Sequence, residues 1–169
     1  MNKIIDIDIV FDTATIVGKY PKPSQNSQSP TGIQHADAYM IAQSSDVISG
    51  QATADLNVSA SVGDVIRWRA DSLSGNSDQS AVIYNIVKFS GTQVTGPIQP
   101  ITASPTVPIP NAANPVQYTP TSQFDYFINA IVNTNGTEGY QVWFYIVERN
   151  HSTLKTLGYY YWDPTLTAS

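Results

Sequence analysis

Apolar and polar residues alternate along several stretches of the chain, which is the pattern of β-strands that bury one face and expose the other. In residues 3–12, isoleucines at every second position fall on one side and aspartates fall on the other. Residues 52–59 and 65–70 alternate in the same way. The alternation predicts a core that includes Ile5, Ile7, Ile9, Trp68, Ile83 and Phe144.

Further strands are predicted in the second half of the chain. Residues 80–89 are apolar on both faces, so we expect a central strand there. Residues 125–132 and 139–148 predict a hairpin, because the Asn-Gly pair between them supplies the positive φ of a tight turn. About eight strands and no convincing helix favour an all-β fold, an antiparallel β-sandwich with the jelly roll as one candidate topology.

The segment 96–120 has a different composition, with seven prolines in twenty-five residues. Each proline ring removes a backbone donor, so this segment cannot form a helix or a central strand. We expect a long crossover between the two sheets of one sandwich. Residues 1–169 then form a single domain, which suits their number.

The composition supports the strand prediction and excludes several function classes. The 17 Ile and 14 Val far outnumber the 5 Leu, and branched side chains suit a pleated surface. The net charge of −5 offers no basic face for nucleic acid, so no nucleic-acid partner is expected. With no cysteine, disulfides, thiolate nucleophiles and cysteine-bound metals are excluded.

The chain shows no segment that would carry it across a membrane. Asp6 and Asp8 interrupt the apolar core that a Sec signal peptide needs. The longest strongly apolar run, residues 142–147, is far too short for a membrane span. We therefore expect a cytoplasmic protein.

Motifs of known enzymes are missing from the sequence. The two histidines, His35 and His151, stand outside any spaced ligand or catalytic motif, and no nucleophile elbow or phosphate-binding loop occurs. Arg67 and Arg69 share one face of a predicted strand, and we expect them to pair with Asp6 or Asp8 across the sheet. These observations predict a protein that is not an enzyme.

The loop from residue 71 to residue 78 (DSLSGNSD) is the main candidate for ligand binding. It offers two carboxylates, hydroxyls and an amide, which suit a sugar or a calcium ion. Its spacing does not fit an EF-hand. The alternative is a turn that hydrogen-bonds its own backbone. The candidate ligand residues in this loop are Asp71, Ser74, Asn76 and Asp78.

A second candidate region lies at the end of the chain. Residues 159–162 (YYYW) alternate on a predicted strand, so about half of these rings face outward, where they can stack on a sugar or cover another protein surface. The alternative is ordinary core packing and exposure. His35, Trp162 and Asp163 are the next candidates for ligand contact.

Several motifs resemble the AidA/PixA family of bacterial inclusion body proteins, and the similarity runs over nearly the whole chain. They are residues 4–6 (IID), His35 with 39–41 (YMI), 49–57 (SGQATADLN), 62–69 (VGDVIRWR), 72–76 (SLSGN), 136–138 (GTE) and 161–165 (YWDPT). The resemblance implies a cytoplasmic bacterial protein that accumulates in inclusions and has no attached catalytic activity. It also implies a role in host interaction. Because no Sec signal is present, we expect any release into the host environment to use another route.

Two functions follow as hypotheses. The first is a lectin-like module that binds carbohydrate through polar loops and aromatic rings. The second is a structural or storage protein that assembles with itself into cytoplasmic inclusions. The weakly charged surface and the scarcity of Lys on predicted strands favour self-association, and a two-fold dimer is the commonest small closed state.

Overall fold

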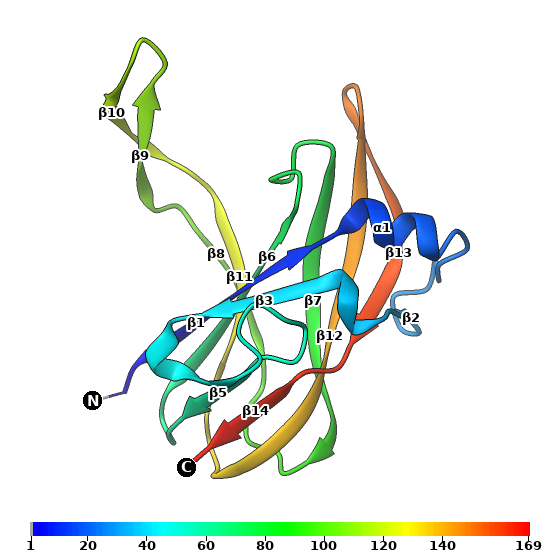
Figure 1. Cartoon of the computed structure of the whole chain (residues 1–169), viewed down its shortest axis with the longest axis vertical. Helices are drawn as coiled ribbons and strands as arrows, with labels where there is room; N and C mark the ends of the chain where they lie inside the picture. The colour runs from blue at the N-terminus through cyan, green and yellow to red at the C-terminus, as the bar shows by residue number, and fades with distance from the viewer. Residues whose placement is uncertain (1) are drawn as a thin grey trace.

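The computed structural model describes residues 2–169, which form two β-sheets facing each other across one apolar core (Figure 1). One sheet has the order β3 (Ala38–Ala42), β1 (Ile4–Phe11), β6 (Val65–Ser72), β11 (Asp125–Ile131) and β8 (Gln99–Ala103). The other has the order β2 (Thr31–Gly32), β13 (Thr153–Trp162), β12 (Gly136–Asn150), β14 (Thr165–Ala168), β5 (Asn57–Ala60) and β4 (Val47–Ser49), and β7 (Gln79–Gly91) pairs with β12.

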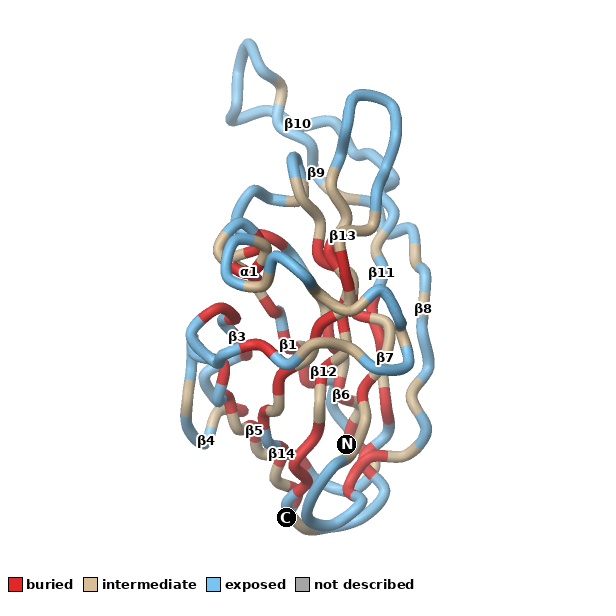
Figure 2. Tube along the Cα trace, turned by 90° about the vertical axis from the view of Figure 1, so that its right-hand side faces the viewer, coloured by how far each residue is buried: buried red, intermediate tan, exposed pale blue. Residues whose placement is uncertain are grey.

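The core lies between the sheets, as the alternating pattern predicted. All six core residues named from the sequence are buried, and Ile5, Trp68 and Phe144 have no exposed surface. The rings of Phe11 and Phe144 stack with centroids 4.1 Å apart and join the two sheets. Figure 2 shows the buried residues along the centre of the sandwich and exposed residues at the loops. Each such apolar side chain contributes about 1.5–3 kcal/mol by leaving water.

The fold is all-β, with about 61% strand and 8% helix, but strand direction differs from the prediction. Three strand pairs are parallel: β1 with β6, β14 with β5, and β13 with β2. The sheets are therefore mixed rather than wholly antiparallel. Alternation along a strand reports which face is buried and carries no information about the direction of the neighbouring strand.

A short helix, α1 (Thr13–Lys19), follows β1 directly, at a position where the sequence showed no convincing helix. The carboxylate of Asp12 accepts a hydrogen bond from the backbone N–H of Thr15 at 3.1 Å and caps the helix. Ile16 is fully buried and anchors it. Two single turns of 3₁₀ helix, η1 (His35–Asp37) and η2 (Ser44–Asp46), also occur. Seven residues rich in β-branched side chains give little helical signal in a sequence.

The segment around residue 136 joins the two sheets and does not close a hairpin. β11 belongs to the first sheet and β12 to the second, so the predicted hairpin is wrong. The turn signal itself was sound: Gly136 has φ +142°, and a Cβ there would lie 2.8 Å from the side chain of Thr92. In the described chain β7 pairs only with β12, so it is an edge strand rather than a central one.

The proline-rich segment 96–120 is mostly strand. It contains β8, β9 (Thr106–Asn111) and most of β10 (Asn114–Ser122). β9 and β10 pair with each other as a separate two-stranded hairpin that projects away from the sandwich (Figure 1). Edge strands and isolated hairpins tolerate proline, so most of this segment can form strands. The crossover between the sheets is therefore shorter than predicted. No helix among residues 2–169 has the length and apolar character needed to cross a membrane.

Candidate functional site

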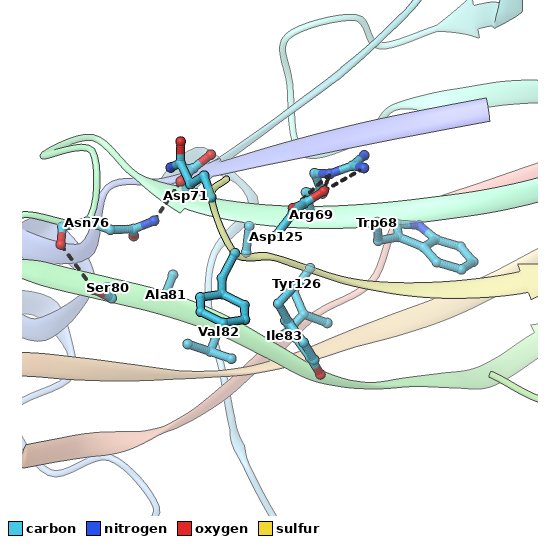
Figure 3. Close-up of a pocket in the computed structure, with 13 residues that line it drawn as sticks. Trp68, Arg69, Asp71, Asn76, Ser80, Ala81, Val82, Ile83, Asp125 and Tyr126 are labelled. Carbon is cyan, nitrogen blue, oxygen red and sulfur yellow. Dashed lines mark hydrogen bonds and ion pairs between the residues drawn. The ribbon is translucent and has the colours of Figure 1, made fainter. Parts of the chain in front are cut away.

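A cleft of about 420 Å³ opens between β6, β7 and the start of β11 (Figure 3). Val82 and Ile83 of β7 form part of its apolar wall. Polar side chains reach it from β6 and from the turn that follows β6. Phe124 and Tyr126, at the start of β11, are exposed to 83% and 40% and bring aromatic surface to it. Its volume falls within the range of small-molecule sites.

An ion-pair network fixes the charged groups beside the cleft. Arg69 donates to the carboxylate of Asp125, with Nε and Nη2 at 3.1 and 3.0 Å from Oδ2. Arg67 and Arg69 both donate to Asp6, which confirms the predicted cross-strand pairing, whereas Asp8 accepts no such bond. The hydrogen bond from Arg67 is the main cause that holds the pKa of Asp6 below its usual range. The network holds the side chains of Arg69 and Asp125 in place.

The two guanidinium groups also stack on an aromatic ring. The Cζ atoms of Arg67 and Arg69 lie 4.9 and 4.8 Å from the centroid of Phe127. Phe127 is 7% exposed. Such cation–π contacts restrict the side chains further.

Asp71, near the end of β6, and Asn76, in the turn that follows β6, both line the cleft. The amide Nδ2 of Asn76 donates to Asp71 Oδ1 at 2.6 Å, and Asn76 Oδ1 accepts from the backbone N–H of Ser72 at 3.1 Å. Burial, with a contribution from the negative charge of Asp8, raises the pKa of Asp71. The turn thus forms hydrogen bonds to its own backbone, which agrees with the alternative prediction of a simple turn. The second carboxylate oxygen of Asp71 has no hydrogen-bond partner among residues 2–169.

Ser74 and Asp78 are separated from the cleft. Both line a different hollow, beside Glu148 and Arg149. The hydroxyl of Ser74 lies 2.9 Å from that of Ser72 and is held within the turn. The structure therefore divides the four candidate residues of this loop between two surfaces.

His35 and Asp163 meet in space, together with an aspartate that the sequence did not single out. His35 Nδ1 lies 2.6 Å from Asp55 Oδ1, and its Nε2 lies 3.0 Å from Asp163 Oδ1. Trp162 is fully buried and donates from Nε1 to the carbonyl of Ala54 at 3.2 Å. Its ring belongs to the core and is not available to a surface ligand.

The described residues show no cluster of side chains arranged to bind calcium. Residues 2–169 hold no group of three or more His, Asp or Glu side chains placed to bind a metal ion. The carboxylates of Asp6 and Asp125 are already engaged by arginine.

The sequence pattern did not predict that Asp71 would share a cleft with Arg69, Phe124, Asp125 and Tyr126. They lie on strands far apart in the chain and meet through the pairing of β6 with β11. One local signal was present: two aromatic residues flank an aspartate at residues 124–126, after a long uncharged stretch.

Comparison with known proteins shows a strong similarity to a family of inclusion body proteins. The family model described as PixA, inclusion body protein, matches residues 3–168. The crystal structure of an inclusion body protein (PixA) from Burkholderia cenocepacia J2315 is 25% identical, covers 99% of this chain and 96% of that chain, and superposes with a TM-score of 0.83. The solution structure of amebosin is 8% identical over 75% of this chain and 93% of that one, and its TM-score of 0.23 carries no structural argument. No curated protein sequence matches.

Proposed function

The chain belongs to the PixA family of inclusion body proteins, and from this premise we propose that it is a non-enzymatic, lectin-like protein whose cleft binds carbohydrate. One observation carries the proposal: the cleft combines a free carboxylate oxygen of Asp71 with the exposed rings of Phe124 and Tyr126. A carboxylate accepts charge-assisted hydrogen bonds from sugar hydroxyls, and an aromatic ring stacks on the apolar face of the same sugar.

Two side chains that could act as catalysts, His35 and Asp125, are engaged in other bonds. Both ring nitrogens of His35 face carboxylates, so neither is free to activate a nucleophile. Arg69 bonds both oxygens of Asp125, which leaves Asp71 without a second free carboxylate beside it in the cleft. A glycosidase needs two such groups. These contacts support binding without reaction.

The location follows as part of the same proposal. The protein accumulates in inclusion bodies inside the cell, and it meets glycans of a host after release by a route other than Sec. Nothing in the cleft requires a metal, so we expect binding to persist in the presence of a chelator.

The test is a glycan array with the purified protein, followed by titration of the strongest glycan. Asp71→Ala removes the free acceptor and should weaken binding about tenfold or more, since a hydrogen bond to a charged group contributes about 1.5–3 kcal/mol. Asp78→Ala is the matched control, because Asp78 belongs to the same loop but faces another hollow. Equal affinities for both variants and the wild type would remove Asp71 from the site. An array without any bound glycan would overturn the proposal.

Self-assembly into inclusions is the second candidate function. It is favoured by the projecting hairpin of β9 and β10, which exposes apolar side chains on a segment without charge. The two functions use different surfaces and do not exclude each other.

A further inference from the structure

The hairpin of β9 and β10, here called the arm (residues 106–122), stands away from the sandwich in both views of the chain (Figures 1 and 2). All nine residues of β10 are exposed. Val116 and Tyr118 are exposed to 88% and 63%, and Ile109 of β9 to 45%. An isolated two-stranded hairpin is only marginally stable in water, so an arm of this kind gains order when a second surface covers it.

The arm carries no charge, and this sets it apart from the rest of the chain. Residues 89–124 contain no Asp, Glu, Lys, Arg or His, whereas the whole chain has 13 acidic and 8 basic residues. Two acidic copies of the chain repel each other through their bodies. Their arms can approach without that repulsion, so a second copy is the occupant that this surface fits best.

Proline determines which side of the arm is available. Pro108 lies directly opposite Pro120 in the register of the hairpin. Neither has an N–H, so they form a pair without mutual hydrogen bonds, and in such pairs the backbone nitrogens point outward from the hairpin. The next outward-pointing pair joins Pro110 to Tyr118. Three of these four outward positions therefore lack a donor, and the arm resists addition of another strand at its edges.

The faces of the arm remain free for contact. Pairs separated by two residues share a face, so Pro108, Pro110, Tyr118 and Pro120 lie on one side. All four are exposed. Rigid proline rings around one tyrosine form an apolar surface that loses little conformational entropy when it is covered. The opposite face is less open, because Val107 is partly buried and Thr119 donates to the side chain of Asn111 at 3.2 Å.

We propose that the arms of two copies pack face to face through this proline–tyrosine surface, with Tyr118 near a two-fold axis. This contact rests on the proposed self-assembly function, for which the arm is the segment that joins two copies. It does not depend on the sugar site. A contact confined to the arms is smaller than a standard stable interface. The contact therefore forms at high protein concentration and produces a two-fold dimer. Other surfaces of these dimers can then pack together into a larger assembly.

The experiment is sedimentation equilibrium of the full chain from micromolar to millimolar concentration. The wild type should move from the 18.4 kDa monomer to twice that mass as concentration rises. Tyr118→Glu should raise the dissociation constant at least ~10-fold, because two negative charges would meet at the axis. Leu154→Glu is the matched control: Leu154 is 71% exposed on the hairpin of β12 and β13, and its change should leave association as in the wild type.

A mixture of two charged variants distinguishes contact between arms from contact of an arm with a body. Tyr118→Glu and Tyr118→Lys should each remain monomeric and should associate with each other when mixed, because the opposite charges meet at the axis. Failure of the mixture to associate would overturn the arm-to-arm contact. Association of Tyr118→Glu alone at the wild-type strength would overturn the arm while leaving self-assembly in place. A wild type that stays monomeric at millimolar concentration would overturn both.

Discussion

Glu138 is the residue that fixes the chain where it crosses from β7 to β8. Its side chain is 1% exposed and accepts hydrogen bonds from the backbone N–H groups of Val94 and Thr95 at 2.7 and 2.8 Å. The hydroxyl of Thr95 donates to the same carboxylate at 3.0 Å. The Gly-Thr-Glu motif at residues 136–138, which carries part of the family resemblance, thus has a structural role.

Glu138→Ala should lower the free energy of unfolding by at least ~2 kcal/mol, because two buried backbone donors lose their acceptor and each costs about 1–3 kcal/mol. Urea denaturation measures the change. Glu148→Ala, near the far end of the same strand, is the control and should stay within about 0.5 kcal/mol of the wild type. A Glu138 variant as stable as the control would show that water replaces the carboxylate without cost.

His35 makes stability depend on pH. Partial burial lowers the pKa of His35, but the hydrogen bonds and charges of Asp55 and then Asp163 outweigh it, so the pKa lies above the usual value. The folded state therefore favours the protonated ring. This stabilisation is complete below the unfolded pKa of about 6.5 and disappears as pH rises through the folded value.

The difference in melting temperature between the wild type and His35→Asn should accordingly be larger at pH 6 than at pH 9. The effect on stability should stay below ~1 kcal/mol, because the histidine and both aspartates are substantially exposed and solvent screens their charges. His151→Asn serves as the control for loss of a histidine. A difference that does not change with pH would contradict the charge assignment.

At the scale of elements, the proline positions in β9 and β10 have a separate consequence. Pro108→Thr with Pro120→Thr would restore outward N–H groups and give the arm edges that accept another strand. We expect the double variant to form aggregates that bind thioflavin T, whereas Thr106→Val with Thr121→Val should not, because it adds β-propensity without changing a donor. Absence of aggregation in the proline variant would show that the edges are protected by something other than proline.

The elements also show what a sequence pattern can reveal. Alternation located β1, β6 and the core residues on their buried faces, because burial acts residue by residue along a strand. It could not show that β1 and β6 run parallel, since pairing depends on contacts far apart in the chain. Helix α1 gave almost no signal, because its order depends on the cap at Asp12 and the anchor at Ile16.

At the scale of the whole molecule, the candidate site could be predicted only in part. Asp71 and Asn76 were predicted together because they are close in the sequence, and both line the cleft. Phe124 and Tyr126 were not, because β11 and the residue before it come to the cleft from a distant part of the chain. Figure 3 shows Tyr126 at this position. Ser74 and Asp78 were grouped with Asp71 by spacing alone, and the turn directs them to another surface.

Binding of sugar in the cleft between β6, β7 and β11 is the function proposed for this protein. Its most direct test is a backbone amide NMR titration of the full chain with the glycan that gives the strongest array signal. We predict shifts confined to residues 69–71, 76, 80–83 and 123–126, which line the cleft. Shifts centred instead on His35, Asp55 and Asp163, or spread over the arm, would contradict binding in the cleft and assign the sugar to another surface.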